Sequence, residues 1–193
     1  MESSAQPLVI TFLGSIGVGK SFFGRQLAER THTIRLNADG LRISMYGTRA
    51  EYDRINGTGP DSNRPIFGAY DYMIKEILTA KKSIILDVAQ FNVLKRRQEL
   101  MRIAKDTGAR VILVWIETPR EVARERVLTR ELSYDQTRVS ETRAQELFDE
   151  HDANFSQPQP GEHVIKISGT VPFEEQYLEF NQQLDAILGS PHE

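Results

Sequence analysis

The sequence contains no cysteine. This absence excludes disulfide bonds, thiolate nucleophiles and zinc or iron–sulfur sites held by cysteine, and it is neutral on the cellular compartment. The four histidines show no spacing typical of paired metal ligands. No apolar run approaches the roughly 20 residues of a membrane-spanning helix, and residues 1–7 lack the basic start and apolar stretch of a signal peptide. We therefore expect a cytoplasmic protein that does not insert into a membrane.

A strong excess of either charge is also missing, because 24 basic and 27 acidic residues give a net charge of −3. This balance gives no reason to expect tight non-specific binding of nucleic acid, although it is compatible with a local basic patch. The 193 residues, 39% hydrophobic and 26% charged, suffice for one well-filled core. We therefore expect a single domain over residues 1–193.

Short apolar runs alternate with helical patterns along the chain. Strands are expected over residues 8–13, 33–37, 83–88, 110–116 and 163–167. Helices are expected over residues 20–30, 66–80, 93–106, from Pro119 onward and over 172–188. This alternation implies right-handed crossovers and a parallel sheet that is covered by helices on both faces. The sequence therefore predicts a three-layer α/β fold.

Two stretches carry little core pattern. Residues 49–64 combine glycine and proline with many polar residues, which predicts a mobile loop. Residues 130–151 form a charged helical segment that a proline- and glycine-rich stretch then stops. We expect both to act as flaps over a ligand, with residues 120–151 as a lid and residues 39–64 on the side of a second substrate.

Residues 14–21 read GSIGVGKS and match the pattern G-x-x-x-x-G-K-[ST] between an expected strand and an expected helix. Glycines let such a loop wrap a polyphosphate with its N–H groups pointing inward, and the helix N-terminus adds positive potential. Lys20 would then reach the β- and γ-phosphates, and the Ser21 hydroxyl would hold Mg²⁺. The motif therefore predicts binding of a nucleoside triphosphate with Mg²⁺. We expect ATP, and the preference for ATP over GTP is left open.

Asp87 ends the apolar run 84–87, as the metal-side acid of a nucleotide-binding sheet does. The alternative is that Asp87 only caps the following helix. Asp39 follows the second expected strand and would face the phosphate loop, where a carboxylate can accept the proton of an incoming hydroxyl. Arg42 lies three residues further on, on the same helical face, and would hold an anionic part of the acceptor or the moving phosphoryl group. The alternative here is that Asp39 caps a helix and Arg42 is solvated.

Arg126 and Arg130 are spaced i, i+4, so both guanidinium groups project from one side of the expected lid helix. There they would neutralise charge as the γ-phosphoryl group moves, although charged helix faces are usually only solvated. The turn at residues 167–170 could read the adenine edge or be a plain turn. The residues expected to bind the nucleotide are Gly14, Ser15, Gly17, Val18, Gly19, Lys20, Ser21, Phe22 and Arg126.

A guanine-reading Asn-Lys-x-Asp motif is absent, which argues against a switch GTPase, and motor ATPases usually have more chain. A small phosphotransferase remains as the leading interpretation. A regulatory ATPase or toxin–antitoxin component is the rival, and a structural protein with a relic phosphate loop is a weaker third. Residues 46–64, which include Arg49, would contact the acceptor by stacking on a base or by binding a sugar phosphate, unless they simply face water.

The motifs GSIGVGKS, NADGLR, IILDVAQ, Arg96-Arg97 and ARERVLTR follow one another in an order that resembles a known group. This group consists of small P-loop kinases similar to the kinase domain of polynucleotide 5′-hydroxyl kinases, with zeta-toxin-like sugar kinases and chloramphenicol phosphotransferases as relatives. The likeness runs from Leu8 to about Thr170 and includes an AAA-type ATP-binding domain. It implies a sheet in the order 2-3-1-4-5.

The resemblance also implies roles for individual residues. Asp39 matches the general base, Arg42 the arginine on the acceptor side, and Arg126 with a lid neighbour the ATP contacts. The sequence departs from the group's Asp-x-x-Asn pattern, because Asp87 is followed by Gln90. The sequence and the resemblance together give Asp39, Arg42, Arg49 and Gln90 as the expected acceptor-binding residues. The acceptor itself is left open between a nucleic-acid 5′-hydroxyl, a nucleotide sugar and another small alcohol, and the oligomeric state is not fixed.

Overall fold

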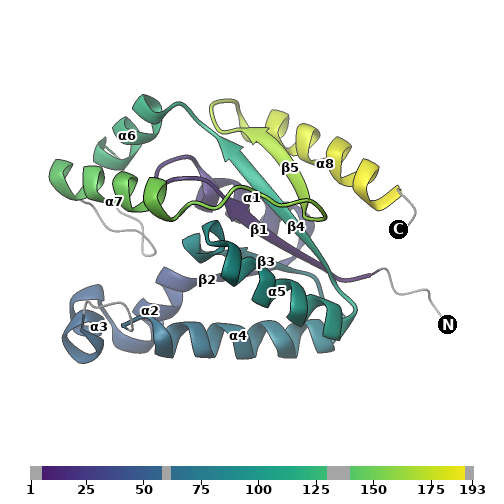
Figure 1. Cartoon of the computed structure of the whole chain (residues 1–193), viewed down its shortest axis with the longest axis horizontal. Coiled ribbons are helices and arrows are strands. Elements are labelled where there is room, and N and C mark those ends of the chain that lie inside the picture. The colour runs from purple at the N-terminus through teal and green to yellow at the C-terminus, as the bar shows by residue number, and fades with distance from the viewer. Residues whose placement is uncertain (1–5, 58–61, 130–139, 190–193) are drawn as a thin grey trace.

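A computed structural model of the chain describes residues 6–57, 62–129 and 140–189 (Figure 1). Its centre is a five-stranded parallel sheet with the order β2-β3-β1-β4-β5. The strands are β1 (Leu8–Leu13), β2 (Ile34–Asn37), β3 (Ile84–Asp87), β4 (Arg110–Glu117) and β5 (His163–Ser168). Both the expected strands and the expected 2-3-1-4-5 order are confirmed.

Helices fill the connections between the strands. They are α1 (Lys20–Thr31), α2 (Ala38–Tyr46), α3 (Arg49–Asn56), α4 (Arg64–Thr79), α5 (Leu94–Thr107), α6 (Arg120–Thr129), α7 (Glu141–Asn154) and α8 (Phe173–Gly189), with a short 3₁₀ turn η1 (Ala89–Asn92). In the described parts of the chain, no helix is both long and apolar enough to span a bilayer.

Alternate residues of each strand point to opposite faces of the sheet, and each face carries its own apolar core. On one face, Val9 and Leu86 pack with α4 and α5 through residues such as Ile74 and Leu100. On the other face, Phe12, Ile85 and Val114 pack with α1 and α8, where Phe23 and Phe180 meet edge to face with ring centroids 5.7 Å apart. Helices on both faces therefore make the three layers that the alternation predicts.

The prediction of a mobile loop over residues 49–64 is wrong for Arg49–Asn56, which is helix α3. Thr48 caps this helix by accepting a hydrogen bond from Glu51 N–H at 3.1 Å, and exposed ion pairs join Arg49 to Asp53 and Arg54 to Glu51. Such a cap and such pairs stabilise a short polar helix that has little apolar pattern of its own. Residues 58–61 of this stretch, and residues 130–139 of the expected lid, lie outside the described part.

All five strands run the same way, so their carboxyl ends meet at one edge of the sheet. Asn37 lies directly opposite Asp87 in the pairing of β2 with β3, and the loop after β1 leads into α1 beside them. Helices α6 and α7 lie on one side of this edge, and α2 and α3 lie on the other (Figure 1). The ends of the strands therefore bring segments that are distant in sequence to one place.

Candidate active site

A cavity of about 1260 Å³ opens at the carboxyl ends of the strands. Its walls come from the loop after β1, from α1, α2, η1, α6 and α7, and from the turn before α8. The sequence-predicted residues that line it are Gly14, Gly17, Gly19, Lys20, Ser21, Phe22, Asp39, Arg42, Arg49, Asp87, Gln90 and Arg126. Ser15 and Val18 belong to the same loop but do not line the cavity. Arg130 lies outside the described residues.

The loop 14–19 has a shape that depends on glycine. Gly17 has a φ of 80°, and a Cβ at this position would lie 2.2 Å from the backbone oxygen of Ala123 in α6. Any other residue would therefore push the loop away from α6, in addition to being strained at that φ. Gly19, at φ 109°, then leads into α1. The loop thus presents its backbone to the cavity at the N-terminus of a helix, which is the arrangement that binds phosphate groups.

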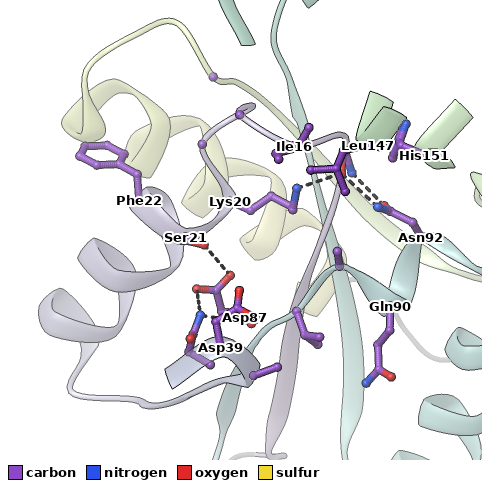
Figure 2. A pocket seen from close by; sticks show the side chains of 18 of the residues that line it. Ile16, Lys20, Ser21, Phe22, Asp39, Asp87, Gln90, Asn92, Leu147 and His151 are labelled. Atoms are coloured by element: carbon purple, nitrogen blue, oxygen red, sulfur yellow. Dashed lines mark hydrogen bonds between the residues drawn. The ribbon is translucent and has the colours of Figure 1, made fainter. Parts of the chain in front are cut away.

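Lys20 begins α1, and its ammonium group is folded onto the loop. Its Nζ donates to the carbonyl oxygens of Gly14 at 3.0 Å and Ser15 at 2.5 Å (Figure 2). Burial lowers the pKa of Lys20 from 10.5 to about 8, and the charge of Asp87 opposes part of this shift. The lysine is therefore a desolvated cation beside the loop, and an anion in the cavity would stabilise its charge.

Asp87, at the end of β3, is buried and accepts hydrogen bonds on both oxygens. Its Oδ1 accepts from the Ser21 hydroxyl at 3.0 Å (Figure 2). Its Oδ2 accepts from Arg35 Nε at 3.1 Å and Asn37 Nδ2 at 3.0 Å, and Arg35 Nη2 forms a further contact with it. Asp87 caps no helix, because the next turn, η1, begins after Val88. The capping alternative for Asp87 is therefore wrong.

The same region fits a magnesium ion. No cluster of three or more acidic or histidine side chains that could hold a metal occurs among the described residues. Mg²⁺ does not need such a cluster, because it keeps several waters and takes one or two protein oxygens together with substrate phosphates. The Ser21 hydroxyl and the Asp87 carboxylate, already 3.0 Å apart, provide this oxygen pair next to the phosphate-loop backbone.

Asn37 precedes α2, and its side-chain amide links the first turn of this helix to Asp87. Its Oδ1 accepts from Gly40 N–H at 2.6 Å and so caps α2, while its Nδ2 donates to Asp87 Oδ2. The cap of this helix is therefore Asn37, and the alternative that Asp39 caps it is wrong. Asp39 lies in the first turn of α2, with its side chain 56% exposed at the cavity wall. Its carboxylate thus stays accessible to a ligand.

Arg42 is nearly buried and makes several contacts. It forms an ion pair with Asp39, donates to Asn63 Oδ1 at 2.8 Å, and lies over the Tyr52 ring at 5.6 Å from the centroid. Its buried Nε has no hydrogen-bond partner among the described residues. Arg42 is therefore not a solvated surface charge, and its ion pair with Asp39 holds the Asp39 carboxylate in position. Arg49 is more exposed and pairs with Asp53 at 2.8 Å.

Gln90 also reaches the cavity, with its amide orientation set by Arg96, whose Nε donates to Gln90 Oε1 at 3.1 Å. The Gln90 Nε2 is buried without a partner among the described residues. Arg126, in α6, donates from Nη1 to the carbonyl oxygen of Gly169 at 2.9 Å, in the turn between β5 and α8. Arg126 thus joins α6 to the turn before α8, and both segments line the cavity.

The analysis of the sequence missed Asn92, whose side chain bonds to the backbone of the phosphate loop. Asn92 lies at the end of η1, two residues after Gln90, and contacts Gly14 (Figure 2). Its own carbonyl oxygen accepts from Ser156 N–H at 2.9 Å and from the fully buried Arg97 at 3.3 Å. The only sequence signal was an asparagine near an expected Asp-x-x-Asn pattern, shifted by two positions.

Helix α7 places Leu147 and His151 at the cavity wall beside the phosphate loop (Figure 2). The His151 ring stacks on Phe155 with centroids 5.0 Å apart, and its Nδ1 lies 3.2 Å from Asp152 Oδ1. Burial lowers the pKa of His151, and the Lys20 charge adds to this shift, while the bond to Asp152 opposes it. The lowered pKa favours the neutral form of His151 at the cavity wall.

The strand order, the glycine loop and the lysine at the start of α1 together define a P-loop fold, a class that binds nucleotides. Similar solved structures have the same fold. Kti12 of Chaetomium thermophilum, solved in complex with ADP-AlF3, has a TM-score of 0.65 at 19% identity, covering 94% of this chain and 99% of that chain. A gluconokinase of Sinorhizobium meliloti 1021 has a TM-score of 0.64 at 16% identity, covering 96% and 95%. Shikimate kinase of Aquifex aeolicus has a TM-score of 0.60 at 19% identity, covering 94% and 99%.

Sequence comparison places the chain within this class. The L-seryl-tRNA(Sec) kinase of Methanococcus maripaludis is 31% identical over 117 residues, which are 58% of this chain and 42% of that relative. The chain thus matches less than half the length of this relative. The family model described as AAA domain matches residues 9–154. The chain belongs to this family, a family of P-loop kinases, as the resemblance in the sequence predicted.

Proposed function

We propose that the protein is an ATP- and Mg²⁺-dependent kinase that transfers the γ-phosphoryl group to a hydroxyl acceptor. The observation that carries this proposal is the position of Asp39. This exposed carboxylate lines the same cavity as Lys20, Ser21 and the phosphate loop, but comes from a different element, α2. A site that only bound or hydrolysed a nucleotide would not need a second carboxylate there.

The proposed step uses Asp39 and Arg42 together with Lys20 and the phosphate loop. The acceptor hydroxyl oxygen forms a bond to the γ-phosphorus, the bond from that phosphorus to the bridging oxygen breaks, and ADP leaves. Asp39 accepts the hydroxyl proton, and Arg42 holds its carboxylate in place. Lys20 and the loop N–H groups stabilise the charge that develops on the phosphate oxygens.

Ser21 and Asp87 are the residues that would hold Mg²⁺ in this proposal. When bound there, the ion would neutralise part of the charge of the phosphate groups. Arg126 and Arg130, which are spaced i, i+4 in the sequence, would approach the phosphates from the proposed lid. Arg49 and Gln90 also line the cavity and would contact the acceptor.

The acceptor is best sought by a transfer assay with γ-labelled ATP and Mg²⁺. The panel should contain 5′-hydroxyl RNA and DNA ends, nucleotide sugars, nucleosides and sugar acids. A serine esterified to tRNA belongs in the panel as well, because the Methanococcus maripaludis relative is named for such an acceptor. Label appearing on one acceptor would support the kinase proposal and name its substrate.

The rival is a regulatory ATPase that hydrolyses ATP without an acceptor. It predicts that label is released only as inorganic phosphate whichever acceptor is added. Release that no panel member changes, at a rate that does not depend on Asp39, would contradict the kinase proposal.

A further inference from the structure

The far end of the cavity, away from Asp39, carries a buried polar atom that the proposed chemistry does not use. Gln176, in the first turn of α8, lines the cavity and is only 2% exposed. Its Nε2 donates to the carbonyl oxygen of Ser168 at 2.9 Å. Its Oε1 is buried without a hydrogen-bond partner in the described residues. A buried acceptor left unpaired costs free energy, so a ligand that supplies a donor gains from it.

The orientation of the Gln176 amide follows from its hydrogen-bond partner. The carbonyl of Ser168 can only accept a hydrogen bond, so the group facing it must be the NH₂ end of Gln176. The amide oxygen Oε1 of Gln176 is therefore the end without a hydrogen-bond partner among the described residues. A second glutamine on α8 shows the contrast, because Gln183 uses both ends of its amide on Lys166, accepting from N–H at 3.1 Å and donating to C=O at 2.7 Å. Holding β5 against α8 thus does not require an unpaired oxygen.

The surroundings of Gln176 fit a nucleotide base. Val171 and Pro172 line the cavity beside it, and Arg126 lies at the neighbouring Gly169 carbonyl. The turn abuts the phosphate loop, since a Cβ on Gly169 would lie 2.4 Å from the Val18 carbonyl oxygen. A nucleotide whose phosphates lie on the loop, with its γ-phosphate toward Asp39, would therefore extend its base toward this turn.

We propose that Gln176 selects a purine that carries an amino group at position 6, as adenine does, over one that carries a carbonyl there, as guanine does. The 6-amino group donates a hydrogen bond to Oε1, whereas a 6-carbonyl places one acceptor against another. This inference rests on the proposed nucleotide site and adds its base specificity. Because Oε1 has almost no accessible surface in this conformation, a base must displace part of the wall to reach it.

Calorimetry with ADP, GDP and IDP in the presence of Mg²⁺ tests the inference, since diphosphates bind without turnover. IDP has the 6-carbonyl of GDP but lacks its 2-amino group. We expect the wild type to bind ADP about 10-fold or more tightly than either GDP or IDP. In Gln176→Met, which keeps the side-chain length without an acceptor of comparable strength, the three affinities should fall within about 3-fold of one another.

Gln183→Met is the matched control, because it also removes a glutamine contact between α8 and β5, and it should keep the preference for ADP. Equal binding of the three diphosphates by the wild type, or an unchanged preference in folded Gln176→Met, would overturn the inference and leave the proposed function standing. Binding of none of them would overturn both. If Gln176→Met does not fold, binding of N6,N6-dimethyl-ADP to the wild type is compared with binding of ADP. The dimethylated base has no donor at position 6, so about 10-fold weaker binding than ADP supports the inference, and equal binding overturns it.

Discussion

The side-chain amide of Asn92 pairs with both backbone groups of Gly14: its Oδ1 accepts from the N–H at 3.0 Å, and its Nδ2 donates to the C=O at 3.1 Å. These two residues are 78 positions apart in sequence. The pair fixes the point where β1 turns into the phosphate loop. The geometry at the start of the phosphate loop therefore depends on a side chain from η1, in the connection between β3 and β4.

Replacing Asn92 by leucine should destabilise the protein and weaken nucleotide binding. The change leaves the buried Gly14 N–H without its partner, which costs about 1–3 kcal/mol in the free energy of unfolding. We expect ADP affinity to fall about 10-fold as the loop loses its fixed geometry. Urea denaturation and calorimetry measure the two effects. Asn56→Leu, which removes a single bond to the Tyr52 carbonyl, is the control and should leave ADP affinity unchanged.

Breaking the ion pair between Arg97 and Glu162 should be more costly. The Arg97 side chain is fully buried, the Glu162 side chain is 4% exposed, and their N···O distance is 2.8 Å. Glu162→Gln would leave the buried guanidinium charge uncompensated, at a cost of about 3–5 kcal/mol in unfolding free energy. Glu174→Gln removes an exposed pair with Arg30 and should cost less than about 1 kcal/mol. Equal effects of the two changes in urea denaturation would contradict this account.

Lys20 should make stability depend on pH. Its pKa is about 8 in the folded chain and 10.5 when exposed, so between these values the unfolded state binds more protons and stability rises with pH. Relative to Lys20→Met, in which this titration is absent, the wild type should gain about 3 kcal/mol between pH 7 and pH 10.5. Urea denaturation of both proteins across this range measures the difference. Lys75→Met, at an exposed position, should track the wild type at every pH.

Asp39→Asn tests the proposed proton acceptor. The amide cannot take a proton from the hydroxyl, so kcat should fall by about 10²–10⁴-fold. The affinity for ADP should change little, because Asp39 is not part of the phosphate loop and its ion pair is with Arg42. The measurements are labelled transfer to the acceptor and calorimetry with ADP. Asp106→Asn, an exposed change on α5, is the control, and full turnover by Asp39→Asn would show that another group accepts the proton.

Asp87→Asn should change the magnesium requirement. Removing the carboxylate charge should raise the Mg²⁺ concentration for half-maximal transfer by about 10–100-fold. ADP binding measured without Mg²⁺ should not weaken, which separates a loss of metal from a loss of fold. Asp71→Asn removes an acid that pairs with Arg96 and should leave the magnesium requirement as it is. An unchanged requirement in Asp87→Asn would remove this residue from the proposed metal site.

The strands and the phosphate loop were predictable, because each depends on a local pattern or on a motif of fixed spacing. The order of the strands was predicted from the resemblance to small P-loop kinases. Asn92 and Arg35 were not, because their partners, Gly14 and Asp87, become neighbours only when the sheet forms. Gln176 was missed for a similar reason: nothing in its neighbouring residues reveals that one end of its amide stays unpaired.

Helix α3 was missed although its signal was present. Thr48 and Glu51 have the spacing of a helix N-cap, but the glycines and proline that follow Asn56 dominated the interpretation of the whole stretch. The roles proposed for Arg42 were incomplete for another reason. Its contacts with Asn63 and Tyr52 come from segments whose placement depends on how α2, α3 and α4 pack.

Asn37 connects the proposed metal position at Asp87 with the start of α2, the helix that bears Asp39. A cation that draws the Asp87 carboxylate toward itself also pulls on the amide that starts the helix bearing Asp39. Occupation of the proposed metal position and orientation of the proposed proton acceptor would thereby be coupled through the Asn37 side chain. The Asp39 carboxylate would then be oriented toward the acceptor hydroxyl only after the nucleotide and Mg²⁺ had bound. This order would limit transfer of the phosphoryl group to water.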